Sequence, residues 1–234
     1  MKKKNAYLIS KYLKKKVGMP YLYGFKQSTE WNKKCTNKEF DSLQKQYGKK
    51  MVWDSDRKKC VGKTPNDCSG AVTSAIGGKQ RGSSQYYDDS KKRIQIRTPQ
   101  LNMDVLKKIP VGAGLWQKGH IGLFIGWKGN VPYYVAEDGS AYGCRIEKVS
   151  KSSFTHALIL PDVDYPVEEV YKLKCMKRVT SYTSSVSKKK KRTFKKGTEL
   201  HIVAEYNGRG LCRKYSKDAN CWVDLNDPNL KKIK

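Results

Sequence analysis

The strongest constraint on the fold of this chain is a run of three strand-like segments that are separated by glycine-bearing turns. They read GHIGLFIGW (119–127), VPYYVAED (131–138) and GCRIEKV (143–149). Short segments of this kind between turns are typical of antiparallel strands. Helical patterns precede them, at about 4–17, in KEFDSLQKQYG and from Cys68 onward. Helices followed by a meander of strands predict an α+β fold.

The composition changes after about residue 165, and this shift predicts a second domain. Residues 172–234 hold 18 Lys+Arg and 5 Asp+Glu, a net charge of +13. Short β-rich segments (TELHIVAEY, LCRKYS, CWVDL) alternate there with turns that contain Gly, Asn or Asp. This pattern favours a small all-β barrel. We therefore expect two domains, residues 1–165 and 172–234.

The net charge of the whole chain indicates what kind of partner it binds. The 234 residues include 49 Lys+Arg and 21 Asp+Glu, which gives +28. Such a chain accumulates on polyanions such as nucleic acid, anionic lipid surfaces or the anionic polymers of a bacterial wall. The sequence contains no RNP, KH or helix-turn-helix signature. We therefore expect no specific nucleic-acid partner.

The N-terminal segment and the cysteines bear on location and on metals. Lysines recur through MKKKNAYLISKYLKKKVG, so it predicts neither a signal peptide nor a membrane span, and we expect synthesis in the cytoplasm. The seven cysteines are odd in number and form no CxxC. This spacing predicts no zinc site, and mostly reduced thiols. A disulfide between Cys35 and Cys60 stays open.

The stretch NDCSGAVTSAIGG places a candidate nucleophile, Cys68, at the start of a helix. Asp67 is a favourable N-cap residue, so Cys68 is expected in the first turn, where unpaired N–H groups and the helix dipole favour a thiolate. Ser69 and Gly70 leave room for a substrate, and the N–H groups there can receive an oxyanion. The alternative is that Cys68 is a small buried hydrophobe.

A thiol nucleophile needs a base and a group that orients this base. Of the three histidines, His120 is the candidate base, because the glycines around it in the strand leave space for a helix that carries a thiol. The orienting group is expected from the next strand. Glu137 is the candidate, with Asp138 behind it. The alternative is that both acids belong only to a turn before Gly139.

Three motifs in order now resemble one family. GMPYLYG (18–24), DCSG (67–70) and GHIG (119–122) resemble the NlpC-type peptidoglycan peptidases, which are papain-like. The resemblance implies that Cys68 is the nucleophile and His120 the base. It implies that Tyr21 lies beside the cysteine and orients substrate or oxyanion, and no metal or cofactor is implied.

The resemblance covers roughly residues 5–162, with two departures. The gap between Tyr23 and Cys68 is long, so about 25–65 reads as an insertion that borders the cleft. The third catalytic position falls at Ala136 or Glu137, and the two assignments stay open.

The tail is similar to bacterial SH3-like wall-binding domains. FKKGTEL (194–200), NGRG (207–210) and CWV (221–223) match turns and strands of those domains, with Arg209 in place of an aromatic residue. The resemblance implies wall binding through Arg209 and Trp222.

Together these resemblances imply a cell-wall hydrolase of the phage endolysin type. It would cleave an amide bond of the peptidoglycan stem peptide, after D-glutamate, and act on the wall after release from the cell. Its partners would be peptidoglycan and anionic wall polymers. The alternatives are an N-acetylmuramoyl-L-alanine amidase and a catalytically inactive wall-binding protein.

Overall fold

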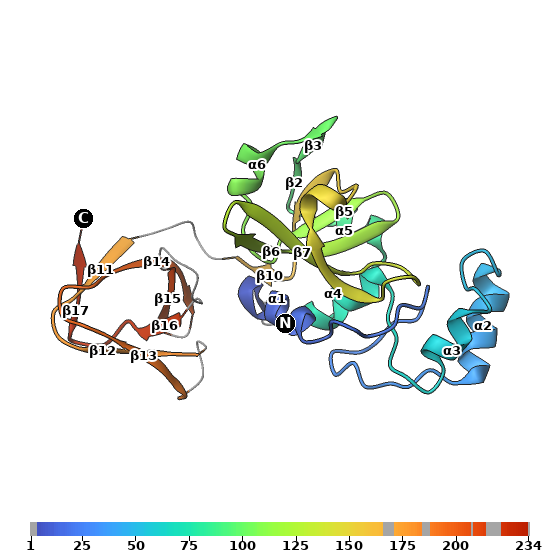
Figure 1. Cartoon of the computed structure of the whole chain (residues 1–234), viewed down its shortest axis with the longest axis horizontal. Helices are drawn as coiled ribbons and strands as arrows, with labels where there is room; N and C mark the ends of the chain where they lie inside the picture. The colour runs from blue at the N-terminus through green and yellow to red at the C-terminus, as the bar shows by residue number, and fades with distance from the viewer. Residues whose placement is uncertain (1–3, 166–170, 184–187, 207, 214–220, 234) are drawn as a thin grey trace. The chain divides into compact units, whose positions relative to one another are not determined.

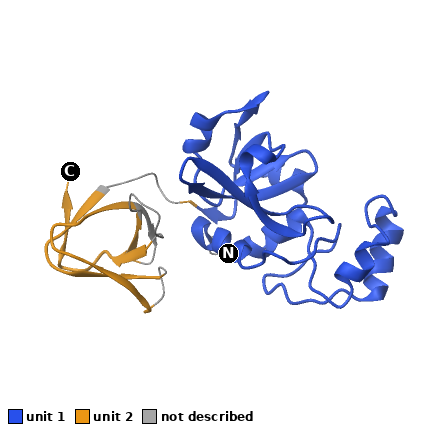
Figure 2. Cartoon of the chain, viewed as in Figure 1, with its two compact units in different colours: residues 1–164 blue, residues 165–234 orange. Residues whose placement is uncertain are grey.

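The chain folds into two compact units, Met1–Asp164 and Tyr165–Lys234 (Figures 1 and 2). The computed structural model describes residues 4–165, 171–183, 188–206, 208–213 and 221–233. Among these residues no helix is long and apolar enough to cross a membrane. The predicted mixture of helices and antiparallel sheets is confirmed.

A six-stranded antiparallel sheet forms the centre of the first unit. In spatial order its strands are β2 (Lys92–Gln95), β9 (His156–Ile159), β5 (Gly114–Gln117), β6 (His120–Lys128), β7 (Val131–Glu137) and β8 (Cys144–Lys148). The three predicted strands are therefore neighbours, and each pairs with the next in sequence. This meander brings the first residue of β6 close to the end of β7.

Two helices cover this sheet and the others lie around it. Helix α4 (Cys68–Ile76) packs against β6, β7 and helix α1 (Ala6–Lys14). All nine residues of α4 are buried, which its small side chains allow. The remaining short elements are α5 (Ser83–Asp88), β3 (Arg97–Thr98), β4 (Gln100–Leu101), α6 (Met103–Lys107), η1 (Val149–Lys151), and β1 (Lys4–Asn5) paired with β10 (Val163–Asp164).

Residues 25–65 form a lobe of the first unit, called here the insertion lobe, with two helices of its own (Figure 1). Helix α2 (Asn37–Tyr47) begins with a capping box between Thr36 and Glu39. Helix α3 (Asp56–Cys60) is joined to α2 by Arg57, which donates to Asp41. The lobe has a separate buried cluster with the adjoining residues: Leu22, Phe25, Cys35, Phe40, Val52 and Cys60.

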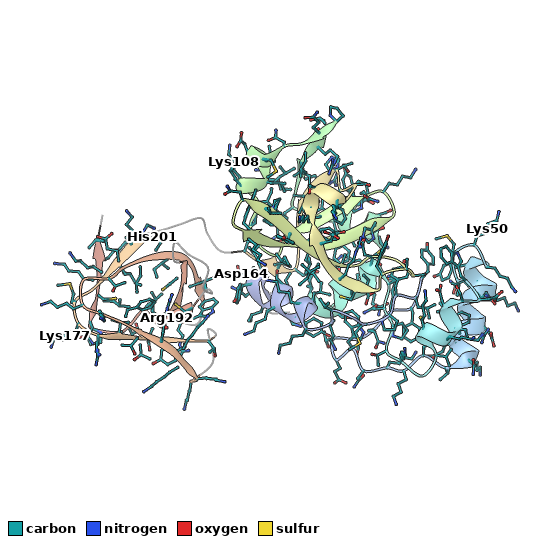
Figure 3. All side chains as sticks on the ribbon, in the orientation of Figure 1. Lys50, Lys108, Asp164, Lys177, Arg192 and His201 are labelled. Carbon is teal, nitrogen blue, oxygen red and sulfur yellow. The ribbon has the colours of Figure 1, made fainter. Side chains whose placement is uncertain are left out.

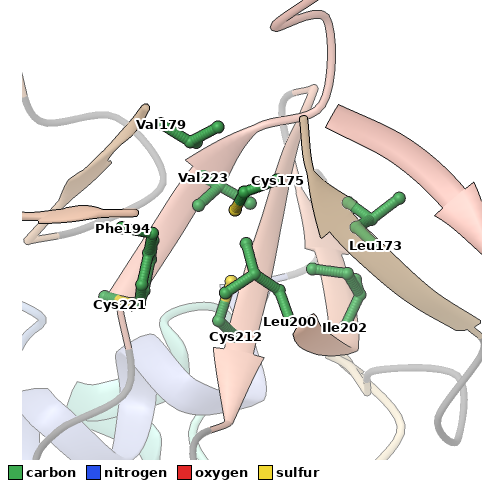
Figure 4. Close-up of a cluster of buried hydrophobic side chains, with 9 residues drawn as sticks. All are labelled: Leu173, Cys175, Val179, Phe194, Leu200, Ile202, Cys212, Cys221 and Val223. Atoms are coloured by element: carbon green, nitrogen blue, oxygen red, sulfur yellow. The ribbon is translucent and has the colours of Figure 1, made fainter. Parts of the chain in front are cut away.

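The second unit is all β in the residues that the structure describes. Its antiparallel sheet has the order β13 (Lys190–Phe194), β12 (Val179–Tyr182), β16 (Cys221–Asp224), β15 (Arg209–Arg213), β14 (Glu199–Tyr206), β11 (Tyr171–Cys175), β17 (Leu230–Ile233). Leu200, Ile202 and Val223 belong to its buried core (Figure 4). Within the described residues the edge strands β13 and β17 are not paired, so a closed barrel is not shown.

Candidate active site

Cys68 is the first residue of α4, as the sequence predicted. The side chain of Asp67 caps the helix, since its Oδ1 accepts a hydrogen bond from the Gly70 N–H at 2.5 Å. Cys68 keeps 7% of its surface exposed, and its Sγ lies 4.0 Å from the Gly119 carbonyl oxygen. The thiol therefore stands at a capped helix start, facing the turn that leads into β6.

Tyr21 is held beside this helix start by backbone pairing. Tyr21 and Asn66 form a parallel bridge, in which the Asn66 N–H donates to the Pro20 carbonyl and the Leu22 N–H donates to the Asn66 carbonyl. Burial, followed by the nearby charges of Cys68 and Asp67, raises the pKa of Tyr21. Its hydroxyl therefore stays protonated and can donate a hydrogen bond to developing negative charge.

His120 begins β6 and is held on two sides. Its Nε2 lies 3.2 Å from Oδ1 of Asp138, and its ring stacks on Phe154 with centroids 5.4 Å apart. Burial lowers the pKa of His120, but the nearby carboxylate of Asp138 and the Cys68 side chain outweigh it and raise the pKa to about 9. Because Nε2 faces Asp138, the other ring nitrogen, Nδ1, is left for the thiol of Cys68.

Asp138 holds the imidazole in place, and two further groups hold Asp138. Its Oδ2 accepts hydrogen bonds from Tyr134 Oη at 2.8 Å and from Arg145 Nε at 2.5 Å. Burial raises the pKa of Asp138, but the adjacent His120 and hydrogen bonds from Tyr134 and Arg145 outweigh it and lower the pKa to about 2. Asp138 therefore stays ionised and fixes the tautomer of His120.

Glu137, the sequence-based candidate for this role, is not the acid that faces His120. It is the last residue of β7 and is fully buried, and neither carboxyl oxygen has a hydrogen-bond partner in the described part of the chain. Burial, followed by the charges of Asp67 and Cys68, raises its pKa well above the usual range. Successive residues of a strand point to opposite faces, so only one of two adjacent acids can face the imidazole. Ala136 is also buried and offers no polar group.

Ser69 belongs to a buried polar network that also contains a lysine the sequence reasoning missed. Ser69 Oγ donates to Asp67 Oδ1 at 2.9 Å and accepts from Lys26 Nζ at 2.6 Å, and Lys26 also pairs with Asp67 Oδ2 at 3.2 Å. The Ser69 hydroxyl is therefore engaged with Asp67, and its contribution to an oxyanion site is limited to the backbone N–H. Nothing in the sequence marks Lys26, which is separated from Ser69 by 43 positions.

The two predicted wall-binding residues lie in different environments in the second unit. The Arg209 guanidinium stacks over the ring of Tyr182, 3.9 Å from its centroid, and Arg209 is half-buried. Trp222 has no exposed surface and is among the largest fully buried side chains. Its placement is that of a core residue, because strand β16 lies between β12 and β15 rather than at an edge.

The arrangement in the first unit suits nucleophilic chemistry. The Cys68 thiol, the His120 imidazole and the Asp138 carboxylate follow one another in space. The N–H groups of the first turn of α4 have no intrahelical acceptor. Within the described ranges no group of three or more His, Cys, Asp or Glu could hold a metal ion. All seven cysteines are free and buried, including Cys35 and Cys60.

Comparisons with known proteins add little to this geometry. No protein-family model matches the chain, and no curated protein matches it. Among solved structures, the chain is similar to the P60 domain of an antigen from M. avium subspecies paratuberculosis, at 16% identity and a TM-score of 0.43. The match covers 68% of this chain and 96% of that domain. A likeness this distant assigns no family to the chain.

Proposed function

We propose that the protein is a cysteine peptidase that hydrolyses an amide bond in the stem peptide of peptidoglycan. The observation that carries the proposal is the order Cys68, His120, Asp138, with the imidazole Nε2 3.2 Å from the carboxylate and the thiol at a helix start. The three motifs that resemble NlpC-type peptidases contain Cys68, His120 and Tyr21, and the papain-like assignment of the first unit rests on them. Release from a phage-infected cell stays a prediction.

The proposed reaction follows from the order of the three groups in the site. The Cys68 thiolate attacks the carbonyl carbon, a C–S bond forms, and the carbonyl oxygen becomes an oxyanion. His120, protonated because its pKa is about 9, gives its proton to the leaving amine as the C–N bond breaks. A water then attacks the thioester while His120 takes up one of its protons. The C–S bond then breaks, the acid product leaves, and the Cys68 thiolate and the protonated His120 are restored.

Three further groups assist these steps. The first-turn N–H groups of Cys68 and Ser69 are the proposed donors to the oxyanion, and the neutral Tyr21 hydroxyl is proposed as a further donor. Asp138 stabilises the imidazolium without taking its proton, because its own pKa is about 2.

The second unit is proposed to hold the enzyme on the wall, as an SH3-like domain. Its excess of Lys+Arg is complementary to the phosphates and carboxylates of wall polymers. Arg209 is the candidate contact, because it lies half-exposed on Tyr182. Trp222 is better placed to support this surface from the core.

Mass spectrometry of fragments released from purified peptidoglycan tests the proposal. Lys-type and diaminopimelate-type walls are digested with wild-type protein, Cys68→Ser and His120→Gln. We expect stem-peptide fragments from the wild type alone, and their masses identify the scissile bond. Complete stems freed from the lactyl group would instead identify an N-acetylmuramoyl-L-alanine amidase. Wall binding without any fragments from the folded wild type would identify a binding protein.

A further inference from the structure

Two tyrosines connect the candidate active site to the insertion lobe. Tyr23 lies two positions after Tyr21, and its pKa is raised by burial and then by Tyr47, Asp67 and Cys68, which places it within electrostatic reach of the nucleophile. Its ring packs edge to face on Tyr47, the last residue of α2, with centroids 5.1 Å apart and planes at 85°. The pair therefore extends from the surroundings of Cys68 to the lobe.

The position of Tyr47 is built into the backbone of the neighbouring segment. Gly24 has φ +76°, and a Cβ placed on it would lie 2.3 Å from Cε2 of Tyr47. A side chain at this position would displace the ring, so the Tyr47 ring packs against the backbone of Gly24 in the space that a Cβ would occupy. Tyr47 nevertheless keeps 38% of its surface exposed. A large aromatic ring is thus held in place and left open to a partner.

The lobe is also tied to the loop that follows Asp138. Ser140 Oγ donates to Oδ2 of Asp56 at 3.0 Å, and Lys59 Nζ donates to the Ser140 carbonyl at 2.9 Å. Asp56 is 1% exposed and Ser140 is half-buried, so the contact between α3 and the active-site loop is partly buried. The contact ties the lobe that carries Tyr47 to the loop that follows Asp138.

The exposed surface of the lobe carries large apolar side chains among its lysines. Met51 and Trp53 are 44% and 51% exposed and lie between α2 and α3, in the loop that Lys50 marks in Figure 3. Large apolar side chains so exposed and so close together are typical of binding surfaces. The neighbouring side chains Lys49 and Asp54 pair with each other, so their charges compensate. Met51 and Trp53 therefore favour a ligand with apolar faces, and the exposed Lys50 beside them adds a hydrogen-bond donor.

We propose that Tyr23 and Tyr47, the aromatic shelf, bind the amino sugar that adjoins the stem peptide while the stem occupies the active site. A pyranose ring presents a C–H face that packs on an aromatic ring, and its hydroxyl and N-acetyl groups hydrogen-bond to a phenol. The raised pKa of Tyr23 keeps its hydroxyl as a donor. This inference deepens the proposed function and depends on it.

Three soluble substrates test the inference: a free stem peptide, the same stem on a disaccharide, and a sugar-free cross-linked stem dimer. We compare kcat/KM for wild type, Tyr47→Ala and Tyr47→Phe. Tyr47→Ala should lower kcat/KM for the disaccharide substrate by about 5- to 10-fold and leave the two sugar-free substrates unchanged. Tyr47→Phe keeps the ring face and should retain most of the activity. Met103→Ala, also at 38% exposure but in α6, is the matched control.

The outcomes separate the two levels of the proposal. Cleavage of none of the three substrates by the folded wild type would overturn the proposed function itself. If the ratio of kcat/KM on the disaccharide substrate to kcat/KM on the sugar-free substrates is the same for wild type and Tyr47→Ala, the aromatic shelf does not bind the sugar. The proposed peptidase activity would be unaffected by that result. A loss of kcat/KM confined to the cross-linked dimer would show that the aromatic shelf binds peptide, and it would overturn the proposal that it binds a sugar. Gly24→Ala displaces the ring without changing it and should reproduce the Tyr47→Ala pattern, once a thermal melt shows that it is folded.

Discussion

Nε2 of His120 lies 3.2 Å from Oδ1 of Asp138, at the point where strand β7 ends and its neighbour β6 begins. The preceding acid, Glu137, is fully buried without a hydrogen-bond partner among the described residues. Two adjacent carboxyl groups thus have opposite pKa shifts. The pKa of Asp138 falls to about 2, whereas the pKa of Glu137 rises. Their different environments assign them different roles, and this difference can be tested.

The alkaline limit of activity should depend on Asp138. The leaving group needs a protonated His120, so kcat/KM on a soluble stem peptide should fall as the pH rises through about 9. Asp138→Asn removes a charge that raises this pKa, and the alkaline limit should move to lower pH. Asp138→Ala should lower kcat/KM by on the order of 10²- to 10⁴-fold. Asp88→Asn makes the same change at an exposed position and is the control. An unmoved limit in Asp138→Asn would remove Asp138 from this role.

Glu137→Gln should leave activity nearly unchanged and alter the pH dependence of stability. The raised pKa of Glu137 means that the folded state binds its proton more tightly than the unfolded state does. Its contribution to stability is complete below the ordinary pKa of 4.5 and is lost as the pH rises above it. The free energy of unfolding of Glu137→Gln, relative to wild type, should therefore increase with pH above 4.5 in urea titrations. A large loss of kcat/KM would show instead that Glu137 acts in catalysis.

Iodoacetamide should modify Cys68 before any other cysteine of the native protein. Cys68 is 7% exposed and lies at a helix start, whereas the other six cysteines are each at most 2% exposed. Peptide mapping should find one carboxyamidomethyl group, at Cys68, and its yield should match the loss of activity. Alkylation in denaturant, where all seven thiols react, is the control. Inactivation with Cys68 unmodified would exclude it as the nucleophile.

Gly70→Ala should destabilise the protein although alanine is the better helix former. A Cβ at Gly70 would lie 2.2 Å from Oδ1 of Asn66, a fully buried side chain. Overpacking of this kind costs about 1–3 kcal/mol. Gly82→Ala is the matched control, because the nearest atom to its Cβ is 3.9 Å away. Gly82 is the N-cap of α5, where alanine is disfavoured, so Gly82→Ala should cost about 0.5–1 kcal/mol, less than Gly70→Ala. Equal effects of the two substitutions would contradict this account.

Salt should separate wall binding from catalysis. The net charge of +28 attracts the chain to anionic wall polymers, and this attraction is screened as ionic strength rises. Sedimentation with purified walls should show weaker binding at high salt, while cleavage of a small stem peptide stays nearly constant. An equal loss in both assays would show that charge also controls the chemical step.

The sequence predicts those parts of the site that follow from local chemistry. The cap at Asp67, the helix from Cys68 and the strand at His120 each depend on a few adjacent residues, and all three occur as predicted. The choice between Glu137 and Asp138 depends instead on where β7 ends relative to β6. That register is set by tertiary pairing, which an alternating pattern does not specify.

Two other features also depend on contacts distant in sequence. Trp222 resembles a wall-binding residue in its local motif, but its full burial follows from the strands on both sides of β16. Lys26 pairs with Asp67 across 41 positions, and no local signal distinguishes it from the other lysines. Because the chain contains many lysines, the sequence alone does not show which of them pair with residues of the site.

The contact of Ser140 with Asp56 has a consequence for how the protein reaches its active form. It joins residues 84 positions apart, and a backbone hydrogen bond from the Gly18 N–H to the Cys144 carbonyl closes a still longer span. Contacts of such high sequence separation lose the most chain entropy when they form, and they slow folding. The contacts of the loop that begins at Asp138 are complete when α3 is docked against Ser140. We therefore expect the protein to gain most of its secondary structure before it gains hydrolytic competence.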